Sequence, residues 1–288
     1  LNITSGVEYS WRIGRTYHRL TPYNLSLVQI DLNSTNTPFL FLGFQDLVFS
    51  GSNYSFSNTW QKGKNRFFLG FDAETGGHLF NLLGRTEIAG IPIAPYVKGS
   101  LDFRYFHQII HKREWAIRGF IGMSEAWGMG GNFVPFEKSF FMGGSNDLRG
   151  WTAYHFGPGA TSENILQTEG FFAAAPIKLL FNAEYRYTIQ EAIKGAFFLD
   201  AGNIWLYNKE YAGNLTPNQI QAISDGVFKT STFMSQLGVN TGFGLRYDLE
   251  FLILRADLGL KVHHPGAVNR SRWVIASPDI RDFNLNLR

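Results

Sequence analysis

The sequence predicts an all-β fold, a transmembrane antiparallel β-barrel, and three observations support this class. Apolar and polar residues alternate with a period of two over most of the 288 residues, as they do in strands with one apolar and one polar face. Aromatic residues make up 16% of the chain, yet its mean hydropathy is only −0.11. The connections between the alternating segments are short and long in turn, which is typical of barrels in the outer membrane.

Six alternating segments precede a long glycine-rich stretch in the middle of the chain. They cover residues 6–15, 24–31, 52–61, 66–74, 97–107 and 114–124. In one of them Leu101, Phe103 and Tyr105 alternate with polar or charged residues. We therefore expect six strands here, each with its apolar side chains on one face of a sheet.

Five more segments follow the glycine-rich stretch. They cover residues 181–187, 197–202, 236–248, 254–263 and 283–288. Their polar faces combine Arg, Asp and Glu with many glycines, and Glu184 and Asp200 lie on these faces. A soluble β-sandwich would also alternate, but this mixture favours a polar lumen opposite a surface that contacts lipid.

The connections between these segments fall into two length classes. Short ones are expected near residues 17–22, 62–65, 110–113, 190–194 and 248–252. Long ones are expected near residues 33–51, 77–96, 128–170, 206–234 and 264–282. The alternation predicts tight turns at the periplasmic end of a barrel and long loops at the other end.

Composition and charge exclude several other classes. No stretch approaches the roughly 18–20 continuous apolar residues of a membrane helix, which excludes a helical membrane protein. The net charge is +3, and basic residues are scattered among acidic ones, so no nucleic-acid partner is predicted. The absence of cysteine excludes disulfides and thiolate chemistry. The chain starts at Leu1 without a signal peptide, so we expect a mature chain or a fragment.

The longest connection, residues 128–170, contains the stretch around which the chain is organised. Gly143 and Gly144 allow backbone angles closed to other residues and predict a tight turn. Arg149 carries a permanent charge that is costly to bury unless carboxylates receive it. We predict that this loop folds into the lumen and docks Arg149 against acidic residues of the wall.

Residues 141–151 read Phe-Met-Gly-Gly-Ser-Asn-Asp-Leu-Arg-Gly-Trp. This stretch resembles the Gly-Gly…(Val/Leu)-Arg-Gly-(Phe/Tyr/Trp) signature in the sixth extracellular loop of the BamA/TamA-type surface-antigen superfamily, whose members are outer-membrane assembly and translocation barrels. Further motifs resemble the strands that follow that loop in the family. They lie at residues 182–187, 195–205, 242–248 and 254–259. The resemblance covers essentially the whole chain.

The resemblance implies a barrel of sixteen strands, of which about eleven are represented. The first five strands and the periplasmic POTRA domains of the family have no counterpart in residues 1–288. Family members end on an aromatic residue, whereas this chain ends Leu287-Arg288. We therefore expect the C-terminal portion of a larger barrel protein, and the alternative is an independent small barrel with an even number of strands.

In the family, the arginine of the loop pairs with acids on the two strands that follow it. The resemblance carries this role to Arg149, Glu184 and Asp200, with Gly150 and Trp151 completing the motif. The alternation agrees, because it places both acids on the polar face. These residues, with the turn at 143–144, are expected to form a latch that holds the loop inside the barrel; the alternative is ordinary charge pairing in the lumen.

Other residue clusters carry weaker signals. Trp151, Tyr154 and Phe156 are expected to pack the loop in the lumen. His263 and His264 have no neighbouring cysteine or spaced acids, so a structural role is favoured over metal binding. Asp72 and Glu74 resemble a glycosidase pair only in type, because both lie on one predicted strand. With no nucleophile elbow, P-loop or His-Glu-x-x-His motif, we expect neither catalysis nor a cofactor.

The function that the resemblance implies is assembly or insertion of proteins in the bacterial outer membrane. The expected partners are the lipid bilayer, unfolded outer-membrane protein clients, and possible accessory lipoproteins and periplasmic chaperones. A seam between the first and last strands would template an incoming strand by edge addition. Two alternatives stay open, a two-partner-type polypeptide secretion pore and a barrel anchor for a fused patatin-like lipase. A passive porin is disfavoured because it does not explain the Arg-Gly-Trp loop.

Overall fold

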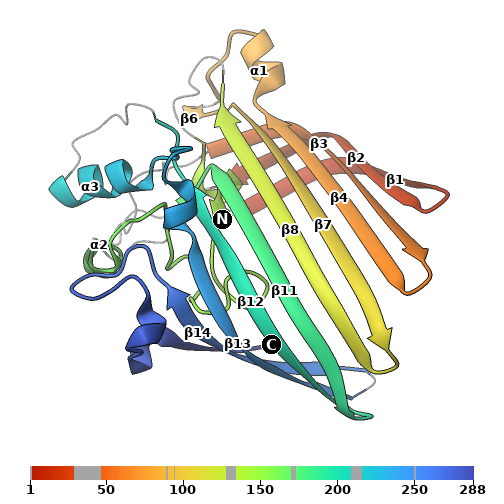
Figure 1. The fold of residues 1–288 in the computed structure, drawn as a ribbon. Helices are drawn as coiled ribbons and strands as arrows, with labels where there is room; N and C mark the ends of the chain where they lie inside the picture. The colour runs from red at the N-terminus through yellow and green to blue at the C-terminus, as the bar shows by residue number, and fades with distance from the viewer. Residues whose placement is uncertain are drawn as a thin grey trace.

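The structure is a computed structural model that describes most of the chain. The described residues are 2–28, 47–88, 90–93, 95–127, 134–169, 173–208, 216–249 and 251–288. Eleven strands form one antiparallel sheet in which each strand pairs with the sheet strands before and after it in the chain. Figure 1 shows how this sheet is arranged. The prediction of an all-β antiparallel fold is confirmed.

Six strands of the large sheet precede the central loop, and five follow it. Those before it are β1 (Asn2–Ile13), β2 (Thr16–Val28), β3 (Leu47–Lys62), β4 (Asn65–Gly76), β7 (Tyr96–Ile110) and β8 (Arg113–Ala126). Those after it are β11 (Ile177–Gln190), β12 (Ile193–Trp205), β13 (Gly238–Asp248), β14 (Ile253–His263) and β15 (Phe283–Leu287). This division into six and five confirms the number of strands predicted on each side of the loop.

The long connections carry the remaining elements. They include two small hairpins, β5 (Glu87–Ile88) with β6 (Ile91–Pro92) and β9 (Phe140–Phe141) with β10 (Ala174–Ala175). The α-helices are α1 (His78–Leu82), α2 (Glu163–Glu169) and α3 (Pro217–Gly226). Single 3₁₀ turns are η1 (Phe136–Lys138), η2 (Phe233–Gln236), η3 (Val274–Ala276) and η4 (Ile280–Asp282).

Within the described ranges, no helix combines the length and the apolar composition needed to cross a membrane.

Tight turns lie at one end of the sheet, and the long connections lie at the other (Figure 1). Two predicted boundaries are wrong. Residues 47–51, predicted to belong to a long connection, lie in β3. The first tight turn is formed by Gly14 and Arg15, whereas residues 17–22, predicted to be a connection, belong to β2. Gly14 has a φ of 60°, which suits the turn. Pro22 resembles a turn signal, but it lies where the register of β2 against β3 shifts between Thr21 and Asn24, and a proline is tolerated at such an irregularity.

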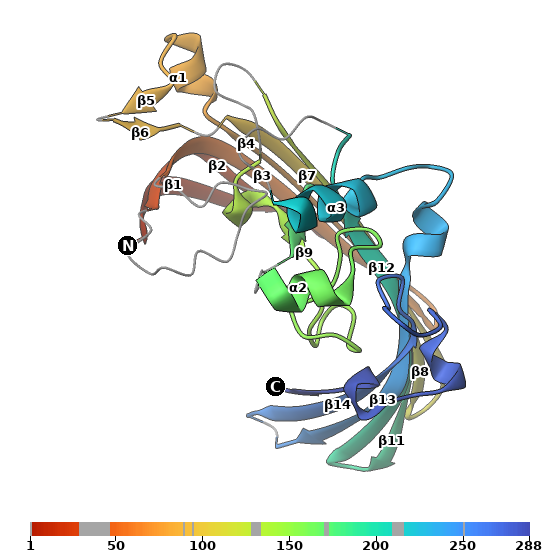
Figure 2. The ribbon, with the colours of Figure 1, turned by 90° about the vertical axis from the view of Figure 1, so that its left-hand side faces the viewer.

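The sheet curves strongly, and the central loop with β9 and α2 lies on its concave side (Figure 2). The strands β1 and β15 form the two edges, and they do not pair with each other within the described residues. The large sheet is therefore an open arc in this chain.

The two faces of the arc differ in character, as the period-two pattern predicts. Phe181, Phe197 and Leu245 lie on the convex face with 43%, 55% and 42% of their surfaces exposed. On the concave face, Glu184 and Asp200 are buried beneath the loop. A soluble protein rarely exposes so extended an apolar surface, whereas a bilayer covers one.

Aromatic residues gather on the strands close to the tight turns. Trp115 and Tyr185 have ring centroids 5.2 Å apart, and Tyr187 stacks on Phe197 at 5.8 Å. Such a band is typical of the level at which a barrel meets the membrane–water interface. It places the tight-turn end of the sheet at one surface of the bilayer.

Candidate functional site

The candidate site is the place where the central loop meets the concave face. The loop leaves β8 and returns at β11, and its base is closed by the pairing of β9 with β10. Gly143 and Gly144 have φ values of 101° and 91°, and a Cβ at Gly143 would lie 2.3 Å from the carbonyl oxygen of Thr152. Gly144 N–H donates to the carbonyl of Trp151 at 2.8 Å, which closes the turn that presents Arg149 to the wall.

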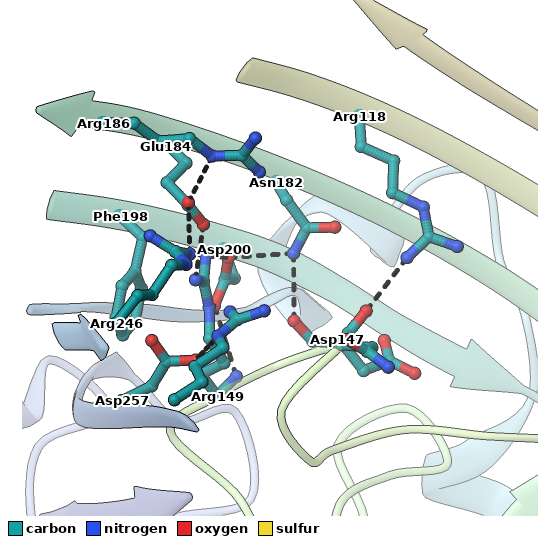
Figure 3. A network of polar contacts seen from close by, with 12 residues as sticks. Arg118, Asp147, Arg149, Asn182, Glu184, Arg186, Phe198, Asp200, Arg246 and Asp257 are labelled. Carbon is teal, nitrogen blue, oxygen red and sulfur yellow. Dashed lines mark hydrogen bonds and ion pairs between the residues drawn. The ribbon is translucent and has the colours of Figure 1, made fainter. Parts of the chain in front are cut away.

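Arg149 lies at the centre of the contact between loop and wall, and its side chain is only 3% exposed. Its Nε donates to Asp200 Oδ2 at 2.9 Å, and its Nη2 donates to Asp200 Oδ1 at 2.7 Å. Its Nη1 donates to Glu184 Oε2 at 2.8 Å. Figure 3 shows the guanidinium between the two carboxylates. The structure therefore brings together the three residues that the resemblance singled out.

Asp200 is completely buried on β12 and is the main acceptor for the loop. Besides the Arg149 side chain, it accepts from the backbone N–H of Arg149 at 3.2 Å. Two amides of the wall complete its shell, because Asn182 donates to Oδ1 and Asn240 donates to Oδ2, each at 2.8 Å. These donors satisfy the carboxylate oxygens although the side chain is shielded from water.

Glu184 on β11 holds three arginines from different parts of the chain. It accepts from Arg149 of the loop, from Arg186 Nε at 2.7 Å on its own strand, and from Arg246 Nη2 on β13. Arg149 also lies over the ring of Phe198, with its Cζ 3.5 Å from the ring centroid. Ionic and cation–π contacts thus fix the guanidinium from several sides.

Burial and charge act in opposite directions on the pKa of Arg149. Removal from water opposes its charged form, but the hydrogen bonds and charge of Asp200, followed by those of Glu184, outweigh this cost. The pKa of Arg149 therefore lies above its ordinary value. The guanidinium therefore carries its charge in the docked loop.

Gly150 and Trp151 seat the loop after the arginine. A Cβ at Gly150 would lie 2.7 Å from the Cβ of Asn240, so only glycine lets the backbone approach β13 this closely. Trp151 is 3% exposed, and its ring packs 4.5 Å from that of Phe156 and 5.6 Å from that of His264. Tyr154 stacks on Phe141 at 4.1 Å, as expected for aromatic packing within the loop.

A second attachment, which the sequence reasoning missed, lies three residues before Gly150. Asp147 forms an ion pair with Lys178 of β11, and its carbonyl oxygen accepts from Asn182 Nδ2 at 2.9 Å. Burial raises the pKa of Asp147, although the charge and hydrogen bond of Lys178 oppose the rise. The signal that could have found this contact is the polar alternation of β11, which places Lys178, Asn182 and Glu184 on one face.

The last strand supplies a third attachment that sequence reasoning also missed. Asn284 and Asn286 of β15 donate their Nδ2 groups to the carbonyl oxygen of Arg149, at 3.0 and 2.9 Å. Nothing in the sequence indicated this contact, because the partners are more than 130 residues apart and asparagine carries no charge signal.

The other residues considered from the sequence lie elsewhere. His263 Nδ1 is 2.6 Å from the carbonyl oxygen of Leu237, and its ring packs against Trp273. Within the described residues, no group of three or more His, Cys, Asp or Glu could hold a metal ion. Glu74 accepts from Tyr96 at 2.6 Å and from Lys138 at 2.5 Å, so it belongs to a wall contact. Asp72 lies two residues before it on the same strand.

The curved antiparallel sheet, its apolar convex face and the arginine-docked loop define an outer-membrane β-barrel protein. The sequence model of the Omp85 superfamily domain matches residues 4–285, and the chain belongs to the Omp85 superfamily. The predicted resemblance to BamA/TamA-type barrels is confirmed at the level of this family, and the protein is located in the bacterial outer membrane.

Two solved structures of CdiB show the same fold at low sequence identity. CdiB from Acinetobacter baumannii is 13% identical with a TM-score of 0.52, over 99% of this chain and 40% of that one. CdiB from Escherichia coli is 13% identical with a TM-score of 0.55, over 92% and 42%. BamA from Haemophilus ducreyi lacking POTRA domains 1–3 also matches, at 13% identity and a TM-score of 0.43, over 91% and 58%. The chain thus spans about two fifths of the two CdiB structures.

Proposed function

We propose that this chain is part of a non-enzymatic barrel that inserts or translocates other polypeptides at the outer membrane. The observation that carries the proposal is the docked Arg149, which is held by Asp200 and Glu184 inside the curved sheet. A passive pore needs no buried loop with a fixed guanidinium. A barrel whose wall must open to a client does need an internal brace.

The brace acts on the C-terminal half of the sheet. Arg149 joins β11 and β12 through the two acids, Asn240 adds β13, and Asn284 adds β15. The loop is therefore bonded to three strands from the inside, and β13 is linked to them through Asp200. In this proposal it preserves the register of the sheet while the edge next to β15 engages a client strand.

The edge strand itself has features that suit strand exchange. β15 has five residues, and all five pair with β14. A short edge strand offers few backbone hydrogen bonds to a neighbour, and free backbone groups at such an edge can template an incoming strand. The clients that fit this chemistry are unfolded outer-membrane proteins, with accessory lipoproteins and periplasmic chaperones as helpers.

Depletion of the protein, followed by an inventory of outer-membrane proteins, tests the proposal. General loss of barrel proteins is the expected result. Loss of one secreted polypeptide with all barrels retained would assign a dedicated secretion pore and contradict an assembly role. Loss of a lipase activity alone, with barrel proteins and secreted polypeptides unchanged, would instead assign an anchor for a fused enzyme.

A further inference from the structure

The concave face beneath the docked loop holds an arginine-lined cavity that the latch does not explain. The cavity has a volume of about 450 Å³. Its charged lining residues are Arg104, Arg118, Arg149, Arg186, Arg255 and Arg288, against the single acid Glu184. The side chains of Ser145 and Asn146 place the loop at one boundary of the cavity.

A second cavity, of about 420 Å³, continues the basic lining toward the tight turns. Its charged residues are Lys112, Arg113, Arg186, Lys194, Arg246 and Arg255, against Glu114. Arg186 and Arg255 line both cavities, so the two form one basic track. The track runs from the turns that follow β7 and β11 to the underside of the loop.

Two pairs of arginines face each other across neighbouring strands in this track. Arg104 of β7 is directly opposite Arg118 of β8, and Arg246 of β13 is directly opposite Arg255 of β14. Like charges in directly opposed positions destabilise a sheet unless anions compensate them. Asp102 is shared by the first pair, so one wall carboxylate serves two guanidinium groups there.

Several guanidinium donors remain available after the wall acids are satisfied. Arg255 donates its Nε to Asp257, and its two terminal nitrogens have no partner in the described part of the chain. Arg246 Nη1 is buried and likewise has no hydrogen-bond partner among the described residues. Figure 3 shows Arg118, Arg186 and Arg246 around the loop, and they lie on β8, β11 and β13. These donors are planar forks suited to oxyanions.

We propose that this track binds the carboxylate side chains of an acidic polypeptide segment. The inference rests on the proposed function, which brings polypeptides to the barrel, and it names the class of segment that the interior accepts. The track reaches the tight turns at Lys112, lies on the concave face and is lined mainly by charged residues. An anionic lipid would have to withdraw its acyl chains from the bilayer to reach it, which disfavours a lipid as the occupant.

Binding of a defined acidic peptide to the purified full-length protein tests the inference. The probe is a fluorescein-labelled twelve-residue peptide with four glutamates, and the matched peptide has four glutamines. Its fluorescence anisotropy is read in detergent at low and high salt. We expect the glutamate peptide to bind at least about tenfold more tightly, with the difference shrinking at high salt. Equal affinity for the two peptides would by itself overturn the proposal, before any variant is tested.

Three variants locate the site. Arg104→Gln leaves Arg118 to pair with Asp102 and is expected to weaken glutamate-peptide binding by about tenfold. Arg255→Lys keeps a charge beside Asp257 but removes the fork, and a smaller loss is expected. Arg19→Gln removes the same charge from β2, outside both cavities, and should leave binding unchanged. Equal losses of peptide affinity in Arg104→Gln and Arg19→Gln would show that binding depends only on net charge, and they would overturn the assignment.

A competing anion distinguishes carboxylate recognition from phosphate recognition. If inorganic tripolyphosphate displaces the peptide and binds more tightly than the peptide does, the track recognises phosphate groups, and the assignment to an acidic polypeptide is overturned. Weak or absent displacement by tripolyphosphate supports the assignment.

Failure of the binding site and failure of the proposed function give different results. Peptide binding could be weakened by Arg104→Gln while depletion leaves the outer-membrane inventory unchanged. That result would support the site and reject the proposed function. Loss of barrel proteins on depletion, with no binding of the glutamate peptide, would support the proposed function and reject the site.

Discussion

The side-chain amide of Asn284 donates to the carbonyl oxygen of Arg149 at 3.0 Å, which ties the edge strand of the sheet to the loop that crosses its interior. The same carbonyl accepts from Asn286 at 2.9 Å. Arg149 thus contacts β11 and β12 through its side chain and β15 through its backbone. Docking of the loop and placement of the edge strand are therefore coupled.

Removing both amides should loosen the loop without disturbing its ion pairs. We expect Asn284→Ala with Asn286→Ala to cost about 1 kcal/mol per hydrogen bond lost and to increase the undocked fraction. The chain has no cysteine, so Leu148→Cys, at a loop position that is 0% exposed, reports undocking by its rate of reaction with a maleimide. A several-fold faster reaction is expected in the double variant.

The control for this experiment is Asn58→Ala, which removes a side-chain bond of 2.7 Å to Thr16 between β2 and β3. Its labelling rate should equal that of the parent carrying only the cysteine. An unchanged rate in the Asn284 and Asn286 variant would show that the edge strand and the loop are independent.

Truncation of Arg149 should be the most damaging change in the loop. Arg149→Ala leaves the fully buried Asp200 without its main partner, and breaking a buried pair in this way costs about 3–5 kcal/mol. Arg149→Lys keeps the charge but cannot hold two carboxylates with one fork, so an intermediate loss is expected. The thermal unfolding midpoint of the purified protein measures both changes.

Arg19→Ala is the matched control, because Arg19 pairs with Glu8 at 3.4 Å on an exposed part of β2. Exposed pairs contribute little to stability, so its midpoint should equal that of the wild type. Should Arg149→Ala melt at the same temperature as Arg19→Ala, the ion pair would be ordinary lumen pairing without a role in holding the loop.

The period-two pattern was sufficient to predict both faces of the sheet, because a strand side chain has only two directions to point. It placed Glu184 and Asp200 on the concave face, and the family resemblance linked them to Arg149. The first turn was misplaced, and the stretch predicted as a connection ends near Pro22, which β2 tolerates at a register shift. The sequence alone does not distinguish a proline in a turn from a proline at an irregularity within a strand.

The remaining contacts of the loop depend on three-dimensional placement. Asn284 has a polar uncharged side chain that fits a lumen wall, a turn or an exposed edge equally well. Its role arises only because β15 brings it beside the backbone of Arg149. Lys178 is similar, since its ion pair with Asp147 requires the loop to fold back over β11. The alternation of β11 places Lys178 on the concave face, but no spacing in the sequence pairs it with Asp147.

A methyl group at residue 150 should push the loop away from β13. In Gly150→Ala the new Cβ would meet the Cβ of Asn240 at 2.7 Å, a distance that requires movement of the backbone. Overpacking of this kind costs about 1–3 kcal/mol. We expect a lower unfolding midpoint and faster labelling of the cysteine at position 148.

Gly119→Ala on β8 is the matched control, because a Cβ at Gly119 meets no atom within 4 Å. It adds the same methyl group to a strand of the same sheet and should leave the labelling rate unchanged. Equal labelling rates in Gly150→Ala and Gly119→Ala would mean that close approach of the loop to β13 is unimportant.

His264 should make the docked loop sensitive to acid. It follows β14 and packs against Trp151 and Phe156, and burial, followed by the nearby charges of Lys261 and Arg270, lowers its pKa from 6.5 to about 3. The unfolded or undocked state therefore binds a proton between these values while the folded state does not. Stability is fully present above pH 6.5 and falls as the pH drops below it, by about 2 kcal/mol at pH 5.

The variant His264→Phe tests this dependence, because it keeps an aromatic ring beside Trp151 and removes the titrating group. The unfolding midpoint of the wild type should fall between pH 7.5 and pH 5, and that of His264→Phe should fall less. His264 Nδ1 lies 3.6 Å from Glu163, beyond hydrogen-bond reach, so the substitution breaks no side-chain bond of the neutral ring. Parallel losses in the two proteins would assign the acid sensitivity to other groups, such as the carboxylates paired with arginine in the wall.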